Sequence, residues 1–144
     1  MFSDDNLVYI FTMLECIEKI FIYAEGHADQ QELVWAGDQR DFNAIWALLL
    51  VIGEKSKKID AELKKEFSAI AWSNIAGMQN YLAHDYRGID HERVWAIIHD
   101  YLPELKLALV DMVNQISYEP AMLIRALDSP YYQHILYLRE KLND

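Results

Sequence analysis

Apolar residues recur at intervals of three and four along most of this chain, and that spacing is typical of amphipathic helices. In residues 4–25 the series comprises Leu7, Ile10, Phe11, Leu14, Ile17 and Phe21. Only five glycines and three prolines interrupt the 144 residues. Long helices can therefore form, and a many-stranded sandwich is disfavoured. We predict an all-α fold, an up-and-down bundle of four to five helices.

The same pattern, together with helix-capping residues, sets the expected boundaries. We expect helices over residues 4–25, 28–36, 39–60, 72–83, 90–117 and 131–142. Asp38 and Asp90 are the expected N-caps of the third and fifth helices. The third helix is apolar on nearly every face, so we expect it at the centre. Pro103 must kink the fifth helix or restart it, and Ser129-Pro130 is expected to begin the last one.

Charge and cysteine content exclude several classes of protein. The net charge of −10 is unlike that of a general nucleic-acid binder, which is usually basic. The single Cys16 excludes an internal disulfide and a multi-cysteine zinc site. The sequence shows neither a basic leader segment nor an uncharged apolar run of 18 residues. We expect a cytoplasmic protein without a membrane anchor.

The charge is spread unevenly, and one segment differs from the rest. Residues 1–54 carry a net −8 and residues 94–144 a net −3, whereas residues 55–93 carry +1. The basic residues of this middle segment are Lys55, Lys57, Lys58, Lys64, Lys65, Arg87 and Arg93. They form either a solvated helix end or the one region that can meet a phosphate without strong repulsion.

Polar groups with useful chemistry concentrate between Gly77 and Tyr86. Asn80 and His84 are four residues apart and share a face of a continuing helix. Gln79 and His84 are five apart, roughly 140° around the helix, so they converge only if the helix ends or another chain completes the site. Histidine can exchange a proton near neutral pH. A histidine near a helix end can equally be a hydrogen-bonded structural group.

Four stretches of the sequence resemble the HepT-like branch of the HEPN superfamily. They are Ile52-Gly53-Glu54, the segment from Ala71 to Met78, the segment from Asn80 to Tyr86, and Val94-Trp95 followed by Leu102-Pro103-Glu104-Leu105. The likeness covers roughly residues 4–117. We therefore expect a HEPN-like helical domain over 1–117 and a C-terminal helical extension over 118–144.

The resemblance implies a homodimer with an active site in a cleft between its subunits. The family motif is an arginine, four residues, a histidine, one residue and a tyrosine. Members resemble metal-independent endoribonuclease toxins that need no cofactor. Their usual partner is an MNT-type nucleotidyltransferase antitoxin, which in some systems transfers AMP to the motif tyrosine. Carried over, His84 is the catalytic histidine, Tyr86 the AMP acceptor, and Asn80 the polar residue after the motif arginine.

The chain departs from the motif at one position, where Gln79 replaces the arginine. Glutamine provides a neutral amide instead of a permanent cation, and losing one such transition-state donor commonly costs roughly 3–4 kcal/mol. Three interpretations follow: a natural member that binds RNA but barely cleaves it, an introduced inactivating substitution, or replacement by another cation such as Arg87 or a lysine of 55–65. We expect reduced or absent cleavage rather than full activity.

Other residues support this site or offer alternatives to it. Glu54 either orients His84 or Arg87, or forms a surface ion pair with Lys57 or Lys58, and Asp85 is a further possible support. We expect no metal site. The aromatic tail packs on its own bundle or reaches a partner. The competing functions are a toxin that cleaves RNA, a non-catalytic nucleotidyltransferase-binding subunit or AMP acceptor, and a structural helical dimer.

Overall fold

The fold is built of helices throughout residues 3–84 and 87–143, the part of the chain that the computed structural model describes. The α-helices are α1 (Asp5–Glu25), α2 (Gln30–Trp35), α3 (Arg40–Ser56), α4 (Ala61–Lys65), α5 (Trp72–His84), α6 (His91–Ala96), α7 (Leu102–Val113) and α8 (Pro120–Leu127). Shorter helical turns cover Ala36–Gln39, Ile97–Tyr101 and Leu136–Asn143. The predicted all-α class is confirmed.

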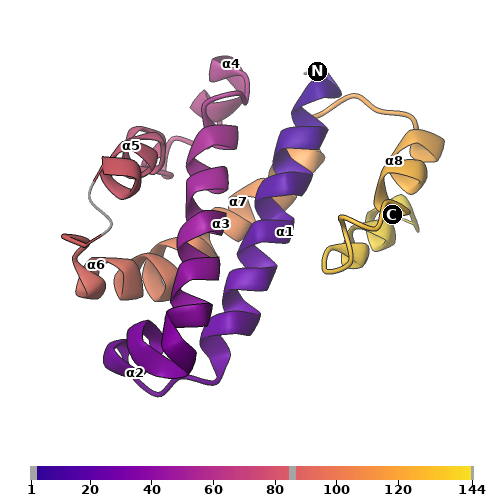
Figure 1. The fold of residues 1–144 in the computed structure, drawn as a ribbon. Coiled ribbons are helices and arrows are strands. Elements are labelled where there is room, and N and C mark those ends of the chain that lie inside the picture. The colour runs from indigo at the N-terminus through magenta and orange to yellow at the C-terminus, as the bar shows by residue number, and fades with distance from the viewer. Residues whose placement is uncertain (1–2, 85–86, 144) are drawn as a thin grey trace.

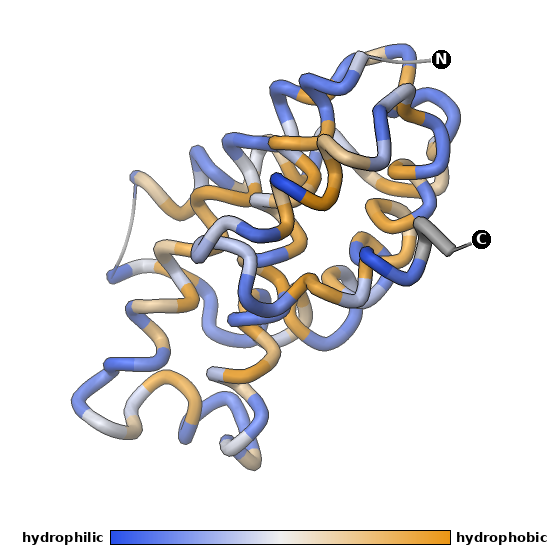
Figure 2. The backbone as a smooth tube through the Cα atoms, turned by 90° about the vertical axis from the view of Figure 1, so that its right-hand side faces the viewer, coloured by the Kyte–Doolittle hydropathy of each residue, from blue (hydrophilic) through white to orange (hydrophobic). Residues whose placement is uncertain are grey.

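The helices pack around an antiparallel pair, α1 and α3, which lie side by side in Figure 1. The α6–α7 segment crosses behind this pair, α5 flanks α3, and α8 with the C-terminus lies beyond α1. The hydrophobic stretches in Figure 2 recur along each helix, as a shared core requires. The candidate site residues at the end of α5 are therefore separated from the C-terminal segment by the central pair.

The central position is shared by α1 and α3, so the expectation that residues 39–60 would lie at the centre is confirmed for Arg40–Ser56. Buried residues occur on nearly every turn of α1, and they include the polar Asn6 and Glu15. α3 instead leaves Asn43 and Ala47 exposed. α3 packs on both α1 and α5, while α7 and the C-terminal segment cover other sides of α1.

Pro103 restarts the helix as predicted. Ile97–Tyr101 forms a π-helical turn between α6 and α7, and Pro103 is the second residue of α7. Proline has no backbone N–H and clashes with the carbonyl of the preceding turn in a regular helix. The wider π turn avoids this conflict and lets the chain continue in nearly the same direction.

Two expected helix starts were wrong. Asp38 does not cap α3, because Gly37, Asp38 and Gln39 all have positive φ and form a left-handed turn before it. The last α-helix begins at Pro120, whereas Ser129 and Pro130 lie in turns. The expected helix over 131–142 is replaced by turns and a 3₁₀ helix, Leu136–Asn143.

The C-terminal segment is fastened to α1 by a buried carboxylate. Glu15, only 4% exposed, accepts hydrogen bonds from the backbone N–H of His134 at 2.8 Å and from its Nδ1 at 2.5 Å. Tyr132 meets Phe11 edge-on, and Lys106 of α7 lies 5.3 Å from the centre of the Tyr137 ring. Tyr132 and Tyr137 thus pack on their own bundle, whereas Tyr131 is exposed.

Candidate functional site

The position of α5 is set by a close approach of its backbone to α3. A Cβ at Gly53 would lie 3.1 Å from both the Gln79 Cβ and the Ile75 carbonyl oxygen. A Cβ at position 53 would therefore require α5 to shift by a few tenths of an ångström. Glycine in the Ile-Gly-Glu stretch therefore brings Gln79 directly against α3.

The C-terminal end of α5 is held by three side chains. The indole Nε1 of Trp46 on α3 donates to the carbonyl of Leu82 at 3.2 Å, which satisfies one of the helix's last acceptors. The hydroxyl of Tyr81 accepts from the backbone N–H of Asp90 at 2.6 Å, and the Arg93 guanidinium lies 4.3 Å from the centre of the Tyr81 ring. These contacts fix the end of α5 relative to the start of α6.

His84 is the last residue of α5, and its side chain is exposed. Asn80, one turn earlier, is also exposed, so the helix presents both residues on one face as predicted. Gln79 is half-buried on the side facing α3. Asp85 and Tyr86 lie outside the described residues, and Arg87 follows them as an exposed cation. The imidazole is thus open to a ligand.

Lysine side chains from the end of α3 approach the same region. Lys57 Nζ donates to Gln79 Oε1 at 2.6 Å. Glu54 lies 3.8 Å from Lys58 and 3.9 Å from Lys55, so it makes the surface ion pair with Lys58 that one of the two interpretations expected. No sequence pattern indicated the Lys57–Gln79 contact, because the two residues are 22 positions apart.

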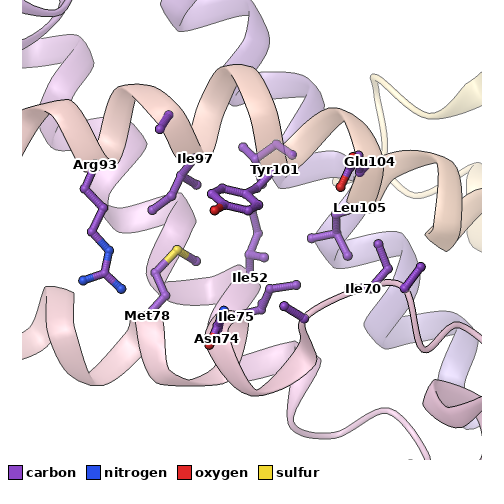
Figure 3. Close-up of a pocket in the computed structure, with 14 residues that line it drawn as sticks. Ile52, Ile70, Asn74, Ile75, Met78, Arg93, Ile97, Tyr101, Glu104 and Leu105 are labelled. Carbon is purple, nitrogen blue, oxygen red and sulfur yellow. The ribbon is translucent and has the colours of Figure 1, made fainter.

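A cavity of about 370 Å³ lies between the first half of α5 and the α6–α7 segment (Figure 3). Its walls are mainly apolar and include Ile75, Met78 and Ile97, while Arg93 stands at one end. Tyr101 is 58% exposed and faces this space. The cavity walls do not include Gln79, Asn80 or His84. The candidate residues therefore stand on an open surface.

Other reactive groups take no part in this site. Burial raises the pKa of the Cys16 thiol to about 11, so it stays protonated and is a poor nucleophile at neutral pH. Across residues 3–84 and 87–143, no group of three or more His, Cys, Asp or Glu side chains is arranged to hold a metal ion. Nor does any helix of this part have the length and apolar composition to cross a membrane.

Comparison with known proteins identifies the family. The family model described as ribonuclease HepT-like matches residues 13–112. The chain belongs to the HepT-like ribonuclease family. A protein of Methanocaldococcus jannaschii with a provisional RNase name is 33% identical over 106 residues, which cover 74% of this chain and 94% of the relative. No solved structure matches significantly.

Two further relatives show the same likeness. A second M. jannaschii protein with a provisional RNase name is 36% identical over 113 residues, which cover 78% of this HepT-like chain and 95% of the relative. A Thermococcus cleftensis protein provisionally named ribonuclease HepT is 33% identical over 69 residues, covering 48% of this chain and 63% of the relative. The resemblance predicted from residues 52–105 is thereby confirmed at the level of the family.

Proposed function

We propose that this chain is a metal-independent endoribonuclease in which His84 is the general acid–base group and whose cleavage rate is reduced because Gln79 replaces the motif arginine. The observation that carries the proposal is an exposed imidazole at the end of α5 in a HepT-like ribonuclease. Asn80 on the same face and the cations around Gln79 are suited to binding the phosphate backbone. The proposed substrate is single-stranded RNA, because its ribose can rotate to place the 2′-hydroxyl in line with the adjacent phosphorus.

The proposed reaction is an intramolecular phosphoryl transfer. The 2′-hydroxyl loses its proton to the imidazole, its oxygen bonds to the adjacent phosphorus, and the bond from phosphorus to the 5′-oxygen breaks. The leaving oxygen takes up a proton from an imidazolium or from water. The products are a 2′,3′-cyclic phosphate and a 5′-hydroxyl. Proton transfer by a positioned side chain typically contributes about 100- to 10,000-fold to such a rate.

The direct test is cleavage of single-stranded RNA by the purified chain in excess EDTA. We expect products that end in a 2′,3′-cyclic phosphate, detected by mass spectrometry, at a rate that magnesium does not change. The matching oligonucleotide with 2′-deoxyribose should remain intact because it lacks the attacking hydroxyl. A magnesium requirement, or 3′-hydroxyl products, would contradict the proposed chemistry.

We also propose a biological setting, a toxin whose homodimer is silenced by an MNT-type nucleotidyltransferase antitoxin. Tyr86, outside the described residues, is the proposed AMP acceptor. Mixing the chain with such a transferase and ATP should add the mass of one AMP, and Tyr86→Phe should prevent the addition.

Gln79 and the net charge of −10 favour the alternative of a non-catalytic partner subunit. AMP addition without any RNA cleavage would support that alternative.

A further inference from the structure

We propose that Lys57, held against Gln79, supplies the cation that binds an RNA phosphate beside His84. The inference rests on the proposed ribonuclease function and adds a residue to it. Lys57 directly follows α3, whereas Gln79 and His84 lie on α5. The spacing of the motif residues along α5 therefore does not indicate that Lys57 belongs to the site. The geometry at the α3–α5 contact supports it.

Lys57 reaches Gln79 because of where Gly53 lies. Gly53 and Lys57 are four residues apart at the end of α3, so they lie on the same face. Gly53 brings that face to within van der Waals contact of the Gln79 Cβ. One turn further on, the Lys57 side chain meets the end of the same glutamine, with Nζ 2.6 Å from Oε1. The glutamine carbonyl oxygen thus holds an ammonium group in place.

In the part of the chain that the structure describes, Lys57 has no carboxylate partner, in contrast to Lys55, Lys58 and Lys65. Lys64 also lacks one there, but it is partly buried and its Nζ donates to the Ser56 carbonyl oxygen. Lys55 and Lys58 both pair with Glu54, and Lys65 pairs with Glu62. Within the described residues, the recorded partner of Lys57 is the neutral Gln79 amide. An exposed ammonium without a carboxylate partner keeps its full attraction for a phosphate.

The pair offers more than one donor to an anion. An ammonium has three N–H groups, and the contact with Gln79 uses one of them. Because Lys57 contacts Gln79 through Oε1, the Nε2 hydrogens of the Gln79 amide remain available to donate to a phosphate. An arginine at position 79 would place two cations together, whereas glutamine attracts the lysine. Lys57 and Gln79 together thus present a charged and a neutral donor in place of a guanidinium fork.

Gln79, which holds Lys57, lies on the same helix as the imidazole. Gln79 and His84 are five residues apart, which corresponds to about 7.5 Å along the axis of α5. Asn80, next to Gln79, shares the exposed face with His84. Gln79 points about 140° around α5 from His84, so a phosphate held by Lys57 lies beside that face, and a neighbouring nucleotide can meet the imidazole.

The test compares Lys57→Ala with Lys58→Ala, a matched loss of one exposed lysine from the same stretch. Binding of a single-stranded 2′-deoxy oligonucleotide is followed by fluorescence anisotropy over a range of salt concentrations. We expect Lys57→Ala to weaken binding about 5- to 10-fold and to reduce the slope of log affinity against log salt by about 0.7. Lys58→Ala should change binding less than twofold, because Glu54, 3.8 Å from Lys58, offsets part of that charge. Lys57→Arg should restore most of the affinity.

Cleavage rates provide a second measurement. Lys57→Ala should slow RNA cleavage at least tenfold, but less than twofold when Gln79→Arg is also present, because the arginine then supplies the charge. Equal effects of Lys57→Ala and Lys58→Ala in both assays would overturn the inference and leave the proposed function standing. If the unsubstituted chain neither binds nor cleaves RNA, the proposed function fails and this inference fails with it.

Discussion

Replacing His84 by alanine is expected to lower the rate of RNA cleavage by about 100- to 10,000-fold, the usual contribution of a general acid–base group. The side chain is exposed at the end of α5, so its removal leaves no buried cavity, and the fold should be retained. The measurement is the single-turnover cleavage rate of a fluorescent single-stranded RNA in EDTA. Unchanged binding of the 2′-deoxy oligonucleotide would assign the loss to the chemical step.

His99→Ala is the matched control for this prediction. His99 is also exposed, and its Nδ1 is 2.8 Å from the carbonyl oxygen of Trp95 in the preceding turn. It lies within the π-helical turn Ile97–Tyr101 rather than at the end of α5, so its loss should change the cleavage rate less than threefold. If the two variants cleave RNA equally fast, His84 is not the acid–base group.

Replacing Glu15 by leucine is expected to produce the largest loss of stability, about 2–4 kcal/mol. Leucine has a similar volume, so the change removes the acceptor more than the packing. The backbone N–H of His134, now without its acceptor, would be left unsatisfied next to an apolar helix. The measurement is the free energy of unfolding from urea denaturation, followed by circular dichroism.

Two further variants make the Glu15 prediction specific. Asp128→Ala breaks an exposed ion pair with Arg139 and should cost less than 1 kcal/mol. His134→Ala removes the ring but keeps the backbone donor. Its loss of unfolding free energy should therefore fall between those of Glu15→Leu and Asp128→Ala. A loss below 1 kcal/mol for Glu15→Leu would show that the buried carboxylate does not fasten the tail.

The helices of the bundle were predictable because their signals are local. The period of three and four residues predicted a helix over 4–25, and α1 covers Asp5–Glu25. The same pattern predicted 72–83, and α5 covers Trp72–His84. Asp90 caps α6 as predicted, because its carboxylate accepts from the backbone N–H groups of Glu92 and Arg93. In each case the deciding contacts lie within one or two turns.

The features that sequence reasoning missed depend on contacts between distant residues. Glu15 and His134 are 119 positions apart, and no periodicity in either segment indicates that they meet. The packing of the C-terminal segment on α1 follows from that contact. The left-handed turn at Asp38 was missed for another reason, because aspartate before a helix is usually a cap.

The candidate site showed the same division between local and distant information. The shared face of Asn80 and His84 follows from helix geometry alone, and the structure has it. Lys57 was only one of several cations considered as a replacement for the motif arginine. The choice among them depends on how closely α3 and α5 pack at Gly53. Whether two subunits complete the site stays a prediction.

The unequal burial of the helices has a consequence for motion. α5 buries only Met78 and Leu82, packs mainly on α3, and has the cavity of Figure 3 on its other side. Detaching it would expose far less apolar surface than detaching α1. Local opening of this helix therefore needs only a fraction of the free energy of global unfolding, and its amides should exchange with deuterium earlier. The imidazole is thus carried by an element that can fluctuate while the central helices stay folded.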